Sequence, residues 1–298
     1  MIMQSHSQQL KQQGFTVLRS ALPEQLIASL INQRDAILDN LPTNHRQTYV
    51  SQGSLVNFGD YPQFAELIAR PQFKQVMQDL GFASSVWLAG YLISKPAASP
   101  ALFWHQDWWG WDHPMSYGDK LPGLGLMIYL TDTFVSNGCL RVIPGSHRHW
   151  HSLHDLPVAH EASLSAIDDT NNIAYQADSD EAGVAVKAGD LVIVDPRLLH
   201  SAYPNQSAHE RSLITLWYVP DYQALPESIQ ARYLQIFNRH DVDTGDAAGG
   251  GLLDSWPEAA KQQLKNFVPA YAGDELPLAI NRRPDQRRMN DSKSFRGS

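Results

Sequence analysis

Hydrophobic and polar positions follow two different periods along the chain, and the first change in period comes near residue 82. Before it, apolar residues recur at helical spacing, and Pro23 stands where a first helical turn would begin. We therefore expect a helix from Pro23 to about Asp39, a shorter one at Gln8–Gln13 and a strand at GFTVLRS between them. A second helical region from Pro62 to about Leu80 is expected to break at Pro71.

The middle of the chain, from residue 83 to 220, consists of short apolar runs separated by Gly, Pro, Asn and Asp turns. The runs are Ser85–Ser94, Leu124–Leu130, Gly138–Ile143, Gly183–Lys187, Leu191–Asp195 and Arg211–Val219. Short strands spaced in this way are typical of a β-sandwich or barrel. Residues 152–182 form a polar insertion that we expect to be a long loop and a candidate lid.

The last part, residues 221–298, returns to helical spacing and ends in a polar tail. Helices are expected at Pro226–Asn238 and Pro257–Phe267, with a flexible hinge at Gly245–Gly251. The tail from Arg282 carries basic residues among polar ones and is interpreted as a solvated, partly disordered terminus. The pattern predicts a mainly β protein with flanking helices in one domain: a helical buttress (1–82), a β core (83–220) and a helical extension with its tail (221–298).

Composition narrows the class of partner. The formal net charge is −8, and the basic residues form no block except the short C-terminal one, so nucleic acid is not expected to bind. No run approaches the roughly 18 apolar residues of a membrane span, and no apolar signal segment opens the chain. We expect a cytoplasmic protein that acts on a small molecule. The single cysteine, Cys139, is expected to be a small buried hydrophobe.

The triplet His105-Gln106-Asp107 is the most informative motif, and His200 follows in the turn after a later apolar run. Two imidazoles and one carboxylate are the ligands of mononuclear non-haem iron(II) sites, which leave one face of the octahedron open. His105 and Asp107 point the same way from an extended segment because alternate residues share a face. Arg211 opens the next apolar run, and its planar fork suits the distal carboxylate of 2-oxoglutarate. The same ligands also bind Zn, Mn, Co and Ni, and Arg211 has a structural ion pair as its alternative role.

The segment from Lys95 to Arg211 resembles the phytanoyl-CoA dioxygenase family of iron(II)/2-oxoglutarate enzymes. The matching motifs are KP at Lys95 and Pro96, WHQD ending at Asp107, NGCLRVIPGSH at Asn137–His147, and H-x-x-x-P-N at His200, Pro204 and Asn205. The resemblance implies a double-stranded β-helix (jelly roll, cupin-like) core. It also implies Fe(II) bound by His105, Asp107 and His200, with 2-oxoglutarate and O2 as co-substrates. The implied reaction hydroxylates an unactivated C–H bond of a small molecule and releases succinate and CO2.

The family pattern also makes Lys95 and Gln106 candidates for contacts to 2-oxoglutarate. Against this, a lysine before proline is usually solvated, and a glutamine between two ligands faces away from the metal in a regular strand. The carboxylate of Asp107 argues against halogenation, because halogenating relatives have a small residue there. Ser201-Ala202 departs from the family, in which a serine often stands two residues after the histidine, and this removes one hydrogen bond to the cofactor.

Other residues near the triad leave their roles open. Trp108, Trp109 and Trp111 either line a pocket for an apolar or cationic substrate or fill the barrel. The cluster His147, His149, His151 and His154 is interpreted as surface histidines, not as a second metal site.

Two other functions stay open. A non-oxidative cupin-type metal-binding protein or isomerase would keep the histidines but would not need Arg211, and the intact triad argues against a silent binding protein. The substrate, the choice among hydroxylation, desaturation and ring closure, and the oligomeric state are not determined by the sequence.

Overall fold

The fold is built around two antiparallel sheets, seen in a computed structural model that describes residues 5–156, 164, 165, 167, 171–239 and 251–291. The larger, six-stranded sheet has the order β1-β7-β4-β9-β3-β2. Its strands are β1 (Phe15–Leu18), β2 (Val56–Asn57), β3 (Ser85–Lys95), β4 (Leu124–Tyr129), β7 (Leu191–Val194) and β9 (Arg211–Pro220). The three-stranded sheet has the order β6-β5-β8 and consists of β5 (Leu140–Val142), β6 (Ala182–Val184) and β8 (His200–Ala202).

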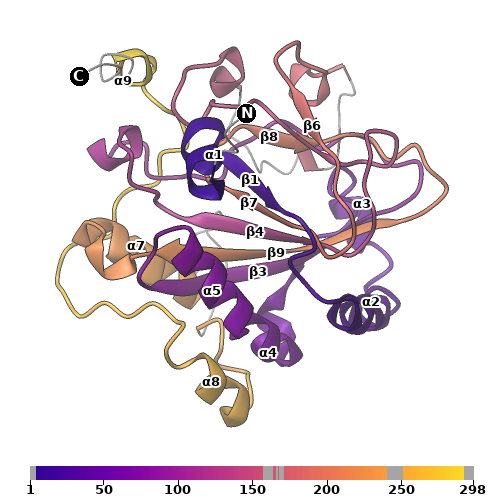
Figure 1. Ribbon diagram of the computed structural model, residues 1–298, viewed down its shortest axis with the longest axis horizontal. Helices are drawn as coiled ribbons and strands as arrows, with labels where there is room; N and C mark the ends of the chain where they lie inside the picture. Colours follow the sequence, from indigo (N-terminus) through magenta and orange to yellow (C-terminus); the bar gives the residue numbers. More distant parts are fainter. Residues whose placement is uncertain (1–4, 157–163, 166, 168–170, 240–250, 292–298) are drawn as a thin grey trace.

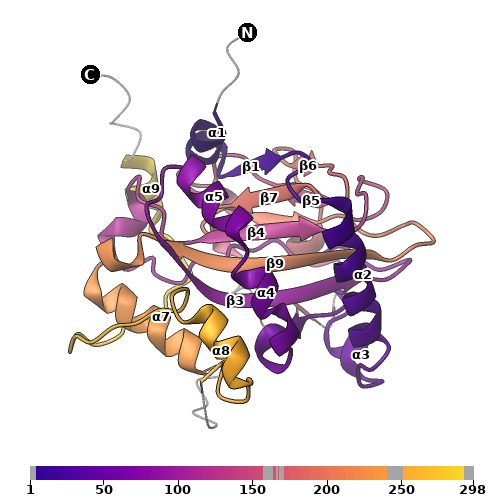
Figure 2. The ribbon, with the colours of Figure 1, turned by 60° about the horizontal axis from the view of Figure 1, so that its bottom comes forward.

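Helices cover one face of the larger sheet. Figures 1 and 2 show α2 (Glu24–Leu38), α4 (Ala65–Ile68) and α5 (Pro71–Asp79) lying across that face. Leu126 and Ile128 of β4 share one buried core with Leu30 of α2 and Phe73 of α5. This packing explains why the apolar residues of the N-terminal part recur at helical spacing, since each helix buries a single face.

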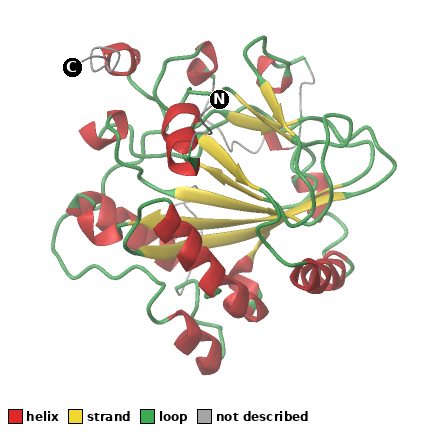
Figure 3. Ribbon diagram, viewed as in Figure 1, coloured by secondary structure: helices red, strands yellow, loops and turns green. Residues whose placement is uncertain are grey.

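The opposite face of the larger sheet meets the smaller sheet and a cavity. Met127 and Tyr129 alternate with the residues that face the helices, and they pack with Leu140 and Val142 of β5. In Figure 3 the strands occupy the middle of the molecule and the helices surround them. The interior between the sheets is therefore where side chains of distant segments meet.

Most predicted elements are confirmed, with shifts at their ends. The N-terminal helix α1 (His6–Gln13) begins earlier than expected because Ser5 caps it, accepting from the backbone N–H of Gln8. The break predicted at Pro71 is present, and this proline opens α5. Strand β5 is shorter than predicted because Gly138, at φ +86°, turns the chain before the strand begins.

Helices α7 (Glu227–Arg239) and α8 (Glu258–Leu264) of the C-terminal part occur where helices were expected. The N-terminal part contains a short helix that was not predicted, α3 (His45–Thr48). Residues 245–250 of the predicted hinge lie outside the described residues. No helix in the described ranges is long and apolar enough to span a bilayer.

The interpretation of the tail as a solvated terminus holds for most of residues 282–290, which are exposed, but it is wrong at Arg282, Pro284 and Met289. We call residues 278–291, which include α9 (Gln286–Asp291), the C-terminal strap. Asn281 donates its N–H to the Trp109 carbonyl at 2.7 Å, and Trp111 donates to the Asn281 carbonyl at 3.2 Å. Met289 is buried among the tryptophans that follow the H-x-D triplet. The prediction failed because the strap's partners lie far away in the sequence.

Candidate metal centre

His105, Asp107 and His200 converge on one point. The Nε2 atoms of His105 and His200 lie 3.9 and 3.4 Å from the two carboxylate oxygens of Asp107. One ligand atom from each residue falls within 4.8 Å of the others, which is close enough to share one metal ion. The two histidine backbones form a reciprocal bridge, N–H to carbonyl, at 3.0 and 2.8 Å. The spacing expected from an extended H-x-D segment is present.

Hydrogen bonds orient both imidazoles. His105 Nδ1 lies 3.0 Å from the Phe103 carbonyl, and His200 Nδ1 lies 3.0 Å from the Leu198 carbonyl. A carbonyl oxygen only accepts, so each Nδ1 carries the hydrogen and each Nε2 presents a lone pair toward the other ligands. The two imidazoles therefore have the tautomer that a divalent cation requires.

The turn Asp195-Pro196-Arg197 holds the third ligand in place. The Pro196 carbonyl accepts the N–H of Asp107 at 2.8 Å. Arg197 grips the buried Asp195 carboxylate with Nε and Nη2, the latter at 2.7 Å, and its Nη1 donates to the Ser116 carbonyl. A buried bidentate pair of this kind fixes the turn, which in turn fixes the backbone of Asp107.

The triad opens into a cavity of about 700 Å³ between the two sheets. Alternate residues of β9 line it, namely Arg211, Leu213, Thr215 and Trp217. Tyr129 from β4 and Tyr91 from β3 complete that wall, while His105 and His200 belong to the opposite one. A cavity of this volume accommodates a small molecule together with a co-substrate.

Arg211 is buried in the cavity wall with unused donors. Its side chain is 3% exposed, and its Nε and Nη1 atoms have no hydrogen-bond partner among the described residues. Burial lowers the pKa of the guanidinium, and the nearby Tyr129 raises it in part. Desolvated guanidinium donors without a partner carry a free-energy penalty, so the site is suited to a bound carboxylate.

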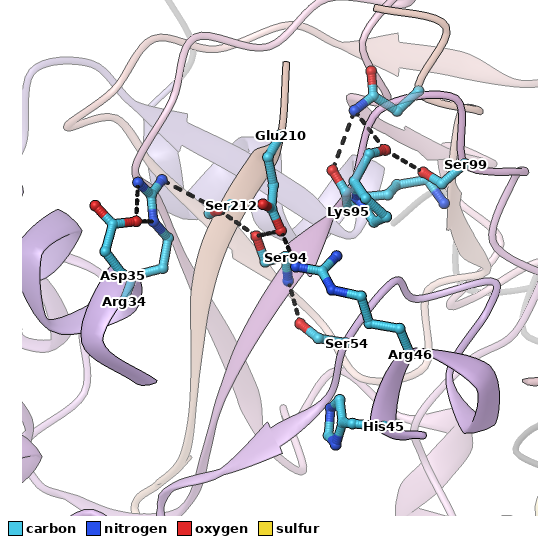
Figure 4. Close-up of polar contacts among 12 residues, drawn as sticks. Arg34, Asp35, His45, Arg46, Ser54, Ser94, Lys95, Ser99, Glu210 and Ser212 are labelled. Atoms are coloured by element: carbon cyan, nitrogen blue, oxygen red, sulfur yellow. Dashed lines mark hydrogen bonds and ion pairs between the residues drawn. The ribbon is translucent and has the colours of Figure 1, made fainter. Parts of the chain in front are cut away.

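Neighbouring carboxylates do not neutralise Arg211. Figure 4 shows Glu210, the residue before it, in a network with Ser94 and Arg46. Ser94 donates its hydroxyl to Glu210 at 2.7 Å, and Arg46 Nη2 donates to the same oxygen at 2.5 Å. Because successive residues of an extended segment face opposite ways, Glu210 forms its hydrogen bonds outside the cavity while Arg211 faces into it.

Lys95, also seen in Figure 4, is buried beside Arg211, which is its register partner on β9. Its ammonium donates to the backbone carbonyls of Ser51, at 2.7 Å, and Pro100. Burial lowers its pKa well below the usual value, and Arg211 and Arg141 lower it further. Lys95 lines the cavity, as expected of a cofactor contact, and it also ties two loops to the end of β3.

Gln106 lies behind the ligands. Its amide Nε2 donates to the Arg282 carbonyl at 2.6 Å, and Gln106 is not among the residues that line the cavity. Because alternate residues of the extended H-x-D segment face opposite ways, Gln106 points away from the metal position. This agrees with the alternative in which it does not contact 2-oxoglutarate.

The three tryptophans separate into two roles. Trp108 and Trp109 line the cavity, whereas Trp111 does not and packs with Tyr222 and Met289. For Trp111 the structure favours the alternative in which it fills the core.

The histidine cluster departs from its interpretation as surface residues. His147 and His154 are buried, and His147 donates Nε2–H to the Lys11 carbonyl at 3.1 Å. His151 accepts the Leu153 N–H at Nδ1, so its Nε2 carries the hydrogen that faces Asp178 at 3.5 Å. With Nδ1 accepting, the imidazole is neutral, and a metal ion would need the lone pair of its Nε2, so this group is better described as a neutral histidine in polar contact with a carboxylate than as a metal site.

Several cavity residues were missed by the sequence analysis. Ser165, from the polar insertion, lines the cavity and accepts the N–H of Ser51 at its carbonyl. Arg282, from the C-terminal strap, lines it as well. Strand alternation could have identified Tyr129 and Trp217, but nothing in the sequence connects Arg282 to the triad. Cys139 is buried, as predicted, and burial raises its pKa to about 11.

Comparison with known proteins assigns the family. The sequence model of the phytanoyl-CoA dioxygenase family matches residues 10–213. The chain belongs to the phytanoyl-CoA dioxygenase family. It is 26% identical to the phytanoyl-CoA dioxygenase of Arabidopsis thaliana over 162 residues, 52% of each chain. A phytanoyl-CoA dioxygenase domain-containing protein 1 homolog of Dictyostelium discoideum is 30% identical over 161 residues, 53% of this chain and 55% of that protein. The chain thus spans about half the length of these relatives.

Solved structures share the fold of this family member. The epimerase SnoN in complex with Fe3+, alpha ketoglutarate and nogalamycin RO aligns with a TM-score of 0.56 at 17% identity, over 91% of this chain and 96% of SnoN. EctD from S. alaskensis with bound Fe aligns with a TM-score of 0.52 at 20% identity, over 72% and 75% of the two chains. The arrangement of sheets and helices is therefore one found in iron-containing proteins.

Proposed function

We propose that the protein is an Fe(II)- and 2-oxoglutarate-dependent dioxygenase that oxidises a small molecule and releases succinate and CO2. The observation that carries this proposal is the placement of the His-Asp-His triad and the unpartnered Arg211 in one cavity. A metal site alone would suit many functions, but a buried guanidinium with free donors implies a second, anionic ligand. Family membership agrees with both requirements.

Each residue of the site has a role in this proposal. His105, Asp107 and His200 would hold the iron through Nε2, carboxylate and Nε2. Bound iron supplies oxygen activation, coupled to the oxidative decarboxylation of 2-oxoglutarate. Arg211 pairs with the distal carboxylate of the co-substrate, and Lys95 lies beside it as its register partner.

Hydroxylation of an unactivated C–H bond is the simplest outcome for this site. Asp107 occupies the position that a halogenase would leave open for halide, so no halogenation is proposed. Solved structures of similar fold include the epimerase SnoN and the carbocyclase SnoK, so product analysis must decide among oxidative outcomes. We further propose that the two sheets form the double-stranded β-helix of this enzyme class and that the whole chain acts as one domain.

The test is oxoglutarate turnover. Protein supplied with Fe(II), ascorbate, 2-oxoglutarate and O2 should release succinate, slowly without substrate and faster with one. His200→Ala should reduce the rate about a hundredfold or more, because it removes a metal ligand. His209→Ala, an exposed histidine outside the cavity, is the matched control and should keep the wild-type rate.

Succinate release that is absent from the wild type, or equal in His200→Ala, would contradict the proposal. Metal binding without oxoglutarate turnover would instead favour the non-oxidative metal protein.

A further inference from the structure

The C-terminal strap places Arg282 in the cavity wall next to a metal ligand. Arg282 Nη1 donates to the backbone carbonyl of Asp107 at 3.1 Å, and the carbonyl of Arg282 accepts the amide of Gln106 at 2.6 Å. The residue is half-buried and lines the same cavity as the triad. Its guanidinium is therefore held close to the metal position by the H-x-D segment itself.

The strap is fastened firmly enough to present this side chain in one place. Besides its two backbone hydrogen bonds to Trp109 and Trp111, Asn281 donates its amide to the Asp112 carboxylate at 2.6 Å. Met289 is buried to 1% exposure in the tryptophan cluster. Anchors on both sides of Arg282 reduce the conformational entropy that the side chain would lose on binding a ligand.

This part of the wall lies outside the residues that the family model matches. The family match ends at residue 213, and the strap begins at residue 278. The triad and Arg211 lie inside the match and account for the chemistry. A cavity residue from outside it is better placed to determine which substrate this particular chain accepts.

The charges in the cavity favour an anionic substrate. Among the described residues that line it, Asp107 is the one carboxylate, whereas Lys95, Arg211 and Arg282 have basic side chains. Lys95 is already bonded to two backbone carbonyls, and Arg211 is assigned to 2-oxoglutarate. The wall contributed by Trp108 and other aromatic and aliphatic side chains offers apolar surface.

We propose that Arg282 binds an anionic group, a carboxylate or a phosphate, on a largely apolar substrate, and so sets the substrate class of the enzyme. The inference rests on the proposed function in one respect, because it assigns Arg211 to the co-substrate. The planar fork of a guanidinium pairs bidentately with either oxyanion, and the low-polarity wall strengthens that pairing.

The test compares three probes of one chain length: octanoate, octyl phosphate and the neutral octanamide. Binding is followed by tryptophan fluorescence, since Trp108, Trp109 and Trp217 line the cavity. It is measured anaerobically on protein saturated with Mn(II) and 2-oxoglutarate, and again on protein without either. At least one anion should bind about tenfold or more tightly than octanamide in both states.

Four variants test which residue makes the anions bind more tightly than octanamide. In protein saturated with Mn(II) and 2-oxoglutarate, where Arg211 is occupied by the co-substrate, Arg282→Gln should bind anion and amide alike, while Arg282→Lys, which keeps the charge, should retain part of the preference. Arg283→Gln, the exposed neighbour, is the matched control and should behave as wild type. Arg211→Gln should keep the preference, and an unchanged thermal midpoint in Arg282→Gln shows that the strap is intact.

The proposal is overturned if neither anion binds more tightly than octanamide, if Arg282→Gln keeps the preference in protein saturated with Mn(II) and 2-oxoglutarate, or if Arg211→Gln alone abolishes it. A tighter octyl phosphate assigns phosphate esters, and a tighter octanoate assigns carboxylic acids. Because binding is read without turnover, an anion preference that depends on Arg282 in a protein without oxygenase activity would refute the proposed function alone.

Discussion

At the residue scale, the site depends on which donors are already used and which are free. The Nδ1–H groups of His105 and His200 donate to backbone carbonyls two residues before each histidine, so each Nε2 directs a lone pair toward the other ligands. Arg211 is the reverse case, because its donors are buried and two of its nitrogens have no partner in the described part of the chain. The unpartnered donors of Arg211 lie in the wall of the cavity that holds the triad, and this combination is why we assign them to a ligand.

Arg211→Lys tests the carboxylate pairing. Lysine keeps the positive charge but lacks the planar fork, so we expect the KM for 2-oxoglutarate to rise about tenfold to a hundredfold, or about 1.4–3 kcal/mol. Steady-state succinate release measures the change. Arg46→Lys, in the arginine that pairs with Glu210 outside the cavity, is the control and should leave KM unchanged. An unaltered KM in Arg211→Lys would exclude bidentate pairing.

His147 should make the protein sensitive to acid. Burial lowers its pKa to about 4, with Asp195 opposing and Arg197 and Arg148 reinforcing the shift. Between that value and about 6.5 the unfolded chain binds the proton that the folded protein refuses, so stability falls as pH decreases through this window. By pH 5 this histidine should cost about 2 kcal/mol of unfolding free energy.

Urea unfolding at pH 7.5 and pH 5 checks this value. His147→Gln should lose less stability than wild type over the same interval by about that amount. His209→Gln, in an exposed histidine, should follow the wild type. An equal pH dependence in all three proteins would show that His147 is not the group responsible.

At the element scale, the strands and helices were predictable where periodicity was strong. The continuous apolar run of β9, which is buried almost throughout, and the helical spacing in α2 each leave a local signal, and both elements lie close to the predicted ranges. The strap left no such signal, because Met289 stands alone among charged residues and its apolar partners follow the H-x-D triplet. Periodicity predicts an element only where apolar residues recur, so it cannot predict the tertiary contacts of a single buried residue such as Met289.

The strap should contribute to stability through Met289. Met289→Ala removes a nearly fully buried side chain from the tryptophan cluster, and we expect a loss of about 2–4 kcal/mol in unfolding free energy. Denaturant unfolding measures it. Gln286→Ala, at an exposed position of the same helix, should change stability by less than about 0.5 kcal/mol. A loss below about 1 kcal/mol for Met289→Ala would show that the strap is only loosely docked.

At the scale of the whole molecule, the cavity brings together segments from all three parts of the chain. Tyr49 comes from the N-terminal part, the triad and Arg211 from the middle and Arg282 from the end. The triad could be predicted because its ligands are a short motif, H-x-D, and one distant histidine. The cavity wall could not, because it depends on how the sheets and the strap close around the triad.

The central claim is that one cavity binds iron and 2-oxoglutarate together. Anaerobic titration of the protein with Fe(II) and 2-oxoglutarate tests it most directly, through the weak metal-to-ligand charge-transfer band in the visible region. We predict a band in the wild type that disappears in His200→Ala and weakens in Arg211→Ala. No band in the wild type at saturating iron and 2-oxoglutarate would contradict the claim.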